Sequence, residues 1–137
     1  METKIHRYPL MILESHLDTF GHVNNASYLQ LFEQARWEII TANGYGLDKV
    51  HETNLGPVIL ELKVRFNREL KLRQKVIIES QVEMQKRKFA IIRQTIRDDT
   101  EGAKIYCTAE FLFGLFDLRE RKLVSPTQEW LKALGVC

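Results

Sequence analysis

One strongly apolar helix, followed almost entirely by strands, is the feature that most constrains the fold of this chain. Between Ser27 and about Ala42, apolar side chains recur at helical spacing and spread over most of the helix circumference. Ser27, with Gln30 three residues later, forms a capping-box pattern at the start, and Asn43 and Gly44 are good stop residues. A helix that is apolar nearly all round must be enclosed by other elements. Its apolar positions are Tyr28, Leu31, Phe32, Ala35 and Ile39, widened by Leu29, Trp37 and Ile40.

Strands with short turns account for most of the remaining chain. After Pro57 apolar and polar side chains alternate with a period of two, which is typical of a strand with one wet face. A short terminal helix is expected from Pro126, with Trp130 and Leu131. The order of elements predicts an α+β fold in which an antiparallel sheet of five or six strands wraps around one central helix. The expected strands cover residues 5–13, 60–66, 76–84, 89–96 and 105–116.

Length and composition narrow the classes of function. A chain of 137 residues with 45% hydrophobic residues can bury the core of one domain, so residues 1–137 are expected to form a single domain. The formal net charge of +2 is nearly balanced, which favours neither nucleic acid nor an anionic membrane as a partner. No stretch has the length and apolar character of a membrane span or signal peptide, and the two cysteines fit a reducing compartment. These features predict a cytoplasmic protein.

The segment just before the helix has an unusual composition for a loop. Residues 16–28 read HLDTFGHVNNASY, with two histidines around a carboxylate and then a double asparagine. This run, continued inside the helix by Glu33, Ala35 and Arg36, closely resembles acyl-CoA thioesterases of the hotdog superfamily. It is most similar to the 4-hydroxybenzoyl-CoA thioesterase branch and its long-chain acyl-CoA relatives. The resemblance implies a hotdog fold, a homodimer or homotetramer, a place in fatty acid metabolism, and thioester hydrolysis without a metal or other cofactor.

The loop contains the groups that such a reaction needs. Thioester hydrolysis requires a group that attacks the carbonyl carbon or activates water, together with donors for the developing oxyanion. Asp18 brings a carboxylate, and the backbone N–H groups from about Val23 to Ser27 lie at the positive end of the helix dipole. The resemblance implies that Asp18 is the catalytic carboxylate, as nucleophile or general base. It gives His22 and Asn25 supporting roles, in which they orient substrate, water or Asp18.

The same residues also have structural interpretations. An aspartate before a helix is often a turn residue, and asparagine is a natural helix cap, so Asp18 and Asn25 can serve only the loop. His22 can do the same. Glu33 is expected to form a structural ion pair with Arg36 rather than to act as a general base. A metal site built from the loop is not expected, because its histidines and aspartate match no standard ligand spacing.

An acyl-CoA substrate needs cations for its phosphates and an apolar surface for its acyl group. The acyl group is expected along the helix, against Tyr28, Phe32 or strand side chains, close to the loop amides that begin at Val23. The candidate cations are Lys63 and Arg65 on the wet face of one strand and Lys86, Arg87 and Lys88 at the next turn. Charges at such positions also keep a hairpin soluble, which is their structural interpretation.

Two other classes of function remain open at this stage. A non-hydrolytic acyl-CoA binding module on the same fold would leave Asp18 idle. A hydratase or dehydratase would need a histidine paired with an acid, for which His22 and Asp18 are conceivable. The acyl group and its carrier, coenzyme A or an acyl carrier protein, are also open. Because a helix wrapped on one side leaves apolar surface and a strand edge uncovered, we expect at least a homodimer.

Overall fold

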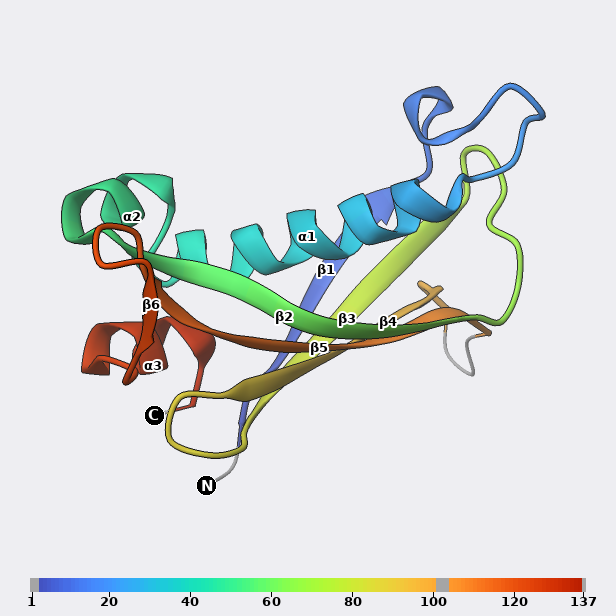
Figure 1. The fold of residues 1–137 in the computed structure, drawn as a ribbon. Coiled ribbons are helices and arrows are strands. Elements are labelled where there is room, and N and C mark those ends of the chain that lie inside the picture. Colours follow the sequence, from blue (N-terminus) through green and yellow to red (C-terminus); the bar gives the residue numbers. More distant parts are fainter. Residues whose placement is uncertain (1–2, 101–103, 137) are drawn as a thin grey trace.

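The structure is a computed structural model that describes residues 3–100 and 104–136. An antiparallel sheet curves around one long helix, which confirms the predicted architecture (Figure 1). Along the sheet the strand order is β1-β3-β4-β5-β2, and the short β6 pairs with β5. The elements are β1 Ile5–Met11, the 3-10 helix η1 Glu14–His16, α1 Asn25–Ala42, α2 Leu47–Thr53, β2 Leu55–Phe66, β3 Lys75–Met84, β4 Ala90–Asp98, β5 Ile105–Asp117, β6 Lys122–Val124 and α3 Gln128–Leu134.

The central helix begins two residues earlier than the sequence pattern predicts. Asn24 is the N-cap, and its side-chain oxygen accepts a hydrogen bond from the Ala26 N–H at 2.8 Å. The expected capping box at Ser27 is therefore wrong, because Ser27 already lies in the first turn of α1. An asparagine can cap a helix as well as a serine can, and two adjacent asparagines left the choice open. The predicted end is confirmed, with Asn43 as the C-cap.

The core lies between α1 and the inner face of the sheet, which we define as the face that packs against this helix. One side of α1 is buried, whereas Glu33, Gln34 and Glu38 are exposed, so the helix is not enclosed on nearly all sides as expected. The alternation predicted for residues 76–84 is confirmed, because Val76, Ile78, Ser80 and Val82 are buried and face α1. The buried residues of α1 are Tyr28, Leu31, Phe32, Ala35, Ile39 and Ile40.

Some boundaries and two short elements differ from the predictions. The first strand ends at Met11 rather than residue 13, and β2 begins at Leu55, five residues before the predicted start. The short α2 and β6 were not predicted. The terminal helix is confirmed as α3, which is capped by Thr127. Among the described residues, the structure contains no helix with the length and apolar character needed to cross a membrane.

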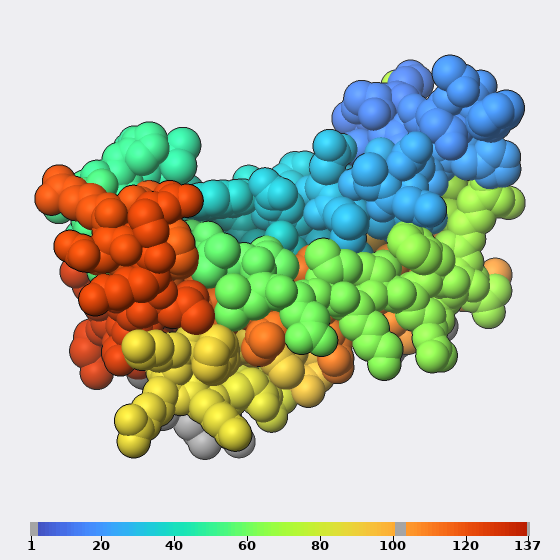
Figure 2. Space-filling view, in the orientation of Figure 1, coloured from blue at the N-terminus to red at the C-terminus, as the bar shows by residue number. Residues whose placement is uncertain are grey.

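Strand β2 forms one edge of the sheet, and its apolar side chains are only half covered. Ile59, Leu62 and Phe66 are 37%, 47% and 48% exposed, although they are large and hydrophobic. Their register partners on β5 are buried, so these three side chains lie on the inner side of the sheet, beside α1. Figure 2 shows the side chains of β2 (green) uncovered along the molecule beside those of α1 (cyan and blue). The expected wet and dry faces of this strand are therefore both open.

Candidate active site

The loop before α1 closes on itself and holds the Asp18 carboxylate against backbone amides of the loop. Leu17 and Val23 form an isolated β-bridge, and the Asp18 N–H donates to the His22 carbonyl at 2.8 Å. The Asp18 Oδ1 atom accepts from the Phe20 N–H at 2.9 Å and from the His22 N–H at 3.1 Å. The chain reverses at Gly21, whose φ of 79° is one that other residues rarely adopt. Closure brings Asp18 next to His22 and Val23, which directly precede Asn24, the N-cap of α1.

The first turn of α1 presents backbone N–H groups at this point. The first N–H groups of any helix lack intrahelical partners and carry the positive end of its dipole. Asn24 uses three of them: its side chain accepts from Ala26, and its carbonyl accepts from Ser27 at 2.9 Å and from Tyr28 at 3.3 Å. The amide of Asn25 precedes these three and is not used by the cap. A carboxylate and a helix amide thus lie at the same end of α1, as acyl transfer requires.

The side chain of His22 is anchored to a distant part of the chain, whereas its backbone bonds Asp18. Its Nδ1 atom pairs with a carboxylate oxygen of Glu69, in the connection between β2 and β3. Both side chains are more than half exposed. A second ion pair ties the same connection to η1, because the Arg73 guanidinium lies 2.7 Å from the Glu14 carboxylate. Sequence reasoning missed Glu69, since no local pattern relates it to a histidine far away in the chain.

The structure separates the other residues expected in the loop and the first turn of the helix. Asn25 is exposed and is not the cap, whereas Val23 is buried with 6% of its surface exposed. The Tyr28 side chain lies in the core, where its hydroxyl accepts from the Leu70 N–H at 3.3 Å and its ring meets Phe66 edge to face. Burial is the main cause that raises the pKa of Tyr28. Tyr28 therefore packs in the core at the start of α1 and does not line an open cavity.

A buried polar network joins the middle of α1 to the sheet. Gln94, only 1% exposed, accepts from the Arg36 guanidinium at 2.9 Å, while its own amide donates to the Phe32 carbonyl at 3.1 Å and the Ser80 hydroxyl at 3.0 Å. The Arg36 guanidinium also stacks on the Phe111 ring, 4.2 Å from its centre. Burial lowers the pKa of Arg36 to about 10.

The expected ion pair between Glu33 and Arg36 is wrong in this arrangement. Glu33 is exposed, and the guanidinium turns inward to an amide and an aromatic ring instead. Glu33 acts on Arg36 only as a nearby negative charge, which opposes the lowering of its pKa. The two residues are three positions apart on α1, but the burial of Phe111 and Gln94 beneath Arg36 decides where its side chain goes.

An apolar pocket of about 240 Å³ lies between the C-terminal half of α1, the sheet and α3. Its lining is almost entirely hydrocarbon and aromatic, with Glu33 and Arg36 as the charged members. Tyr28 and Phe32, expected to contact an acyl group, are not among its lining residues and precede the part of α1 that forms its wall. The lining residues are Glu33, Arg36, Trp37, Ile39, Ile40, Pro57, Ile59, Val82, Ile92, Phe113, Trp130 and Leu134.

Lys63 and Arg65 lie on the outer face of the sheet, away from α1. Gln94 faces α1, and side chains alternate along a strand, so the adjacent Arg93 faces outward. Glu110 pairs in register with both Lys63 and Arg93, so the Lys63 side chain points to the same face as Arg93. Arg65 is two residues further along and points the same way. Within one chain these two cations are on the opposite side of the sheet from Asp18.

Arg87 and Lys88 lie at the other end of the molecule. They belong to the turn between β3 and β4, whereas the Asp18 loop lies at the opposite end of β3, where His22 pairs with Glu69 of the β2–β3 connection (Figure 1). The ten residues of β3 span about 33 Å at about 3.3 Å per residue. One chain therefore cannot bring Arg87 or Lys88 to the loop.

The histidines of the loop are engaged by protein atoms. His16 Nδ1 accepts from the Leu13 N–H at 2.9 Å, and His22 pairs with Glu69. Nowhere in residues 3–100 or 104–136 do three or more His, Cys, Asp or Glu side chains group as metal ligands would. The loop thus brings a carboxylate next to backbone amides.

An antiparallel sheet that wraps around one long helix is the arrangement of the hotdog fold, which is the fold of thioesterases. Residues 13–134 match the Thioesterase-like superfamily, and the chain belongs to this family. It is a thioester hydrolase, as the sequence predicted.

Individual relatives agree with this assignment. The long-chain acyl-CoA thioesterase FadM of Escherichia coli (strain K12) is 30% identical over 110 residues, which are 80% of this chain and 82% of FadM. Among solved structures, the probable thioesterase YbaW from Escherichia coli has a TM-score of 0.80 at 25% identity, covering 95% of this chain and 96% of that one. Slr0204 of Synechocystis, a 1,4-dihydroxy-2-naphthoyl-CoA thioesterase, shares the fold with a TM-score of 0.85 at 15% identity, covering 96% of each chain.

Proposed function

We propose that this protein hydrolyses acyl-CoA thioesters to the free acid and coenzyme A, with Asp18 as the catalytic carboxylate. The observation that supports the proposal is the closed loop, in which the Leu17–Val23 bridge holds Asp18 next to the residues that directly precede Asn24, the N-cap of α1. Two comparisons support the choice of substrate. FadM is named a long-chain acyl-CoA thioesterase, and SAV2348 of Staphylococcus aureus, which shares the fold with a TM-score of 0.85, was solved in complex with coenzyme A.

The proposed reaction uses both parts of the loop. The thioester carbonyl oxygen accepts from the amide of Asn25, where the helix dipole stabilises the negative charge that develops. The Asp18 carboxylate either removes a proton from a water molecule that adds to the carbonyl carbon, or adds itself and forms an anhydride that water then cleaves. In both routes the bond between carbon and sulfur breaks, coenzyme A leaves as the thiol after taking a proton, and the acid remains.

The hydratase alternative is less well supported than hydrolysis. Proton transfer at carbon would need His22 paired with an acid that also faces the substrate. The Nδ1 atom of His22 pairs with Glu69, and the Asp18 carboxylate accepts from backbone amides. We therefore assign His22 to holding the loop against the β2–β3 connection, and Asn25 to donating through its backbone.

A homodimer would bring the expected phosphate ligands to the loop. The half-exposed Ile59, Leu62 and Phe66 lie on an open sheet edge, which a second copy can cover by pairing β2 with its own β2. Two-fold pairing about the middle of β2 is antiparallel, so it sets the first half of one strand beside the second half of the other. In the second copy, the turn with Arg87 and Lys88 lies near the first half of β2. Gly114 of β5 pairs with Val58 in that half, and a Cβ placed on Gly114 would lie 2.9 Å from the Lys88 carbonyl oxygen. We propose that Arg87 and Lys88 bind the phosphates of coenzyme A at the other subunit's site, whereas Lys63 and Arg65 stay on the outer face of the continuous sheet.

A thiol-release assay tests the activity directly. The purified chain is given acyl-CoAs from acetyl to stearoyl, together with benzoyl-CoA and hydroxybenzoyl-CoA, and the same acyl groups on an acyl carrier protein. We expect turnover of acyl-CoAs, with the carrier-protein substrates slower because they lack the 3′-phosphate that the cations would bind. Binding of acyl-CoA without release of thiol would identify a binding module instead and would contradict the proposal.

A further inference from the structure

We propose that the apolar pocket holds the distal half of a long unbranched acyl chain and that Trp130 is its floor, so that Trp130 determines the longest acyl group that the enzyme accepts. This inference rests on the proposed function, because it assigns the part of the substrate that is remote from the thioester. It identifies Trp130 as a specificity-determining residue, and it favours aliphatic over hydroxyaromatic acyl groups.

The size of the pocket fits a stretch of about eight carbons. Its wall on α1 runs from Glu33 to Ile40, which is about 10 Å at 1.5 Å per residue. An extended chain advances about 1.2 Å per bond, so about eight carbons fill this length.

The distance from the thioester to the pocket adds the proximal half of the chain. The Asn25 amide, the proposed oxyanion donor, precedes Glu33 by eight residues of α1, or about 12 Å. Roughly ten further carbons cover that distance. Along this path Phe66 and Leu62 present half-exposed apolar side chains on the inner side of β2. The total is an acyl group of roughly sixteen to eighteen carbons.

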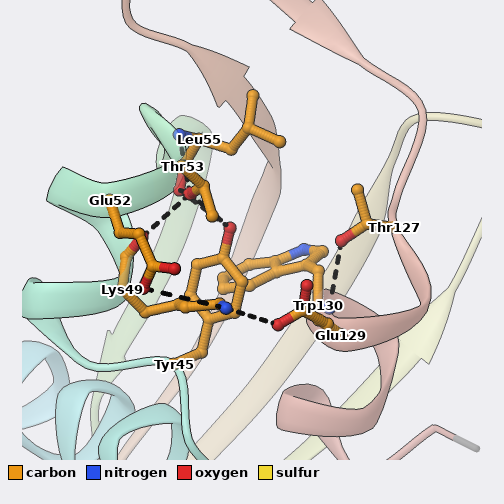
Figure 3. Close-up of polar contacts among 8 residues, drawn as sticks. All are labelled: Tyr45, Lys49, Glu52, Thr53, Leu55, Thr127, Glu129 and Trp130. Carbon is orange, nitrogen blue, oxygen red and sulfur yellow. Dashed lines mark hydrogen bonds and ion pairs between the residues drawn. The ribbon is translucent and has the colours of Figure 1, made fainter.

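The floor is rigid because several contacts fix Trp130 at the end of α1. Its ring packs edge to face on Tyr45, with centres 5.1 Å apart, and on Phe113 at 6.4 Å, and only 2% of the residue is exposed. Figure 3 shows the Trp130 and Tyr45 rings against each other between α2 and α3. The two short helices are joined by an ion pair of 2.7 Å between Lys49 and Glu129.

Tyr45 is fixed in turn by polar contacts behind it. Its hydroxyl lies 3.1 Å from the Thr53 hydroxyl and donates to the Leu55 carbonyl at 3.0 Å. The N-cap of α3 adds a further constraint, since the Thr127 hydroxyl oxygen accepts from the Trp130 N–H at 3.2 Å. A chain that reaches the indole therefore meets a wall that cannot easily yield, and an additional methylene gains no buried surface there.

The test compares chain-length profiles of wild type, Trp130→Leu and Tyr45→Phe. Each methylene that enters the pocket should raise kcat/KM about fourfold. For wild type we expect this rise to continue up to stearoyl-CoA and to stop at arachidoyl-CoA. Trp130→Leu opens the floor, so arachidoyl-CoA should gain about tenfold relative to decanoyl-CoA, whereas octanoyl-CoA and decanoyl-CoA should change less than twofold. Tyr45→Phe is the matched control, because it weakens the same cluster without changing a residue that lines the pocket.

Several outcomes would overturn the inference while leaving the proposed function intact. They are a Trp130→Leu profile parallel to that of wild type, an equal effect on octanoyl-CoA, or the same shift in Tyr45→Phe. Faster turnover of hydroxybenzoyl-CoA than of palmitoyl-CoA by wild type would also contradict it. If wild type releases thiol from none of the acyl-CoAs, the proposed function itself fails. Thermal unfolding of each variant shows whether it is folded, and if Trp130→Leu does not fold, Trp130→Phe provides the same comparison with a smaller opening.

Discussion

Replacing Gln94 by methionine should show how strongly the buried polar network stabilises the protein. Methionine keeps the length and nearly the volume of the side chain but removes its amide, so packing is conserved and three hydrogen bonds are lost. The acceptor of the Arg36 guanidinium disappears in a site where that charge is largely buried. The loss of this contact is the main expected cost, because a buried charged donor without a partner is expensive.

The magnitude follows from the three contacts. A hydrogen bond to a charged group contributes about 1.5–3 kcal/mol, and each of the two neutral bonds to Phe32 and Ser80 contributes about 1 kcal/mol. Since Phe32 and Ser80 keep other possible partners, we expect a total loss of about 3 kcal/mol. For a chain of this size that corresponds to a fall in Tm of about 10 °C.

Urea unfolding at fixed protein concentration measures the loss, and a double-mutant cycle with Arg36→Met isolates the charged contact. The double variant should be less destabilised than the sum of the single variants, with a coupling of about 1.5–3 kcal/mol. Gln81→Met is the matched control on the neighbouring strand, where the amide is exposed, and it should change stability by less than about 0.5 kcal/mol. A loss below about 1 kcal/mol for Gln94→Met, or additive single effects, would refute the reasoning.

Two further predictions concern pH and assembly. Burial, followed by the nearby charge of Lys4, lowers the pKa of His6 from 6.5, and its buried Nε2 atom contacts no partner within the described chain. The His6 side chain therefore binds a proton more tightly in the unfolded chain, so the free energy of unfolding should fall as the pH drops below 6.5. Urea unfolding at a series of pH values should show a smaller fall for His6→Gln than for wild type. Light scattering should find a homodimer at micromolar concentration, and Leu62→Lys, which puts a charge on the open edge of β2, should shift it to monomer. An active wild-type monomer would contradict both the dimer and a site shared between subunits.

Much of the fold could be predicted because its largest elements carry strong periodic patterns. The stripe from Tyr28 to Ile39 and the alternation from Val76 to Met84 each repeat several times, so they identify a helix and a strand reliably. The start of α1 was misplaced because Asn24 and Ser27 are both good caps, and only the closed loop decides between them.

The site was only partly predictable, since much of it comes from residues that are far apart in the chain. Asp18 stands in a continuous motif before the helix, so the sequence alone could single it out as a candidate, and its catalytic role stays a prediction. Glu69 and Gln94 could not, because their partners His22 and Arg36 are set by the packing of distant elements. A signal for Gln94 did exist: an amide at an inward position of an alternating strand needs buried partners. The floor at Trp130 depends on how α3 packs on the end of α1, which no local pattern contains.

The most direct test of the central claim is the turnover number of Asp18→Asn beside that of Asp117→Asn. Asp117 makes the same kind of turn, since its Oδ1 atom accepts from the Arg119 and Glu120 amides at 2.9 and 3.0 Å, but it lies outside the loop. Asparagine keeps an oxygen that can accept both bonds in each turn, so both variants should fold. If Asp18 is the catalytic carboxylate, Asp18→Asn should lower kcat by roughly two to four orders of magnitude with little change in KM, whereas Asp117→Asn should leave kcat within about twofold. If Asp18→Asn hydrolyses palmitoyl-CoA and hydroxybenzoyl-CoA at the wild-type rate, Asp18 is a turn residue like Asp117, and the proposed mechanism is contradicted.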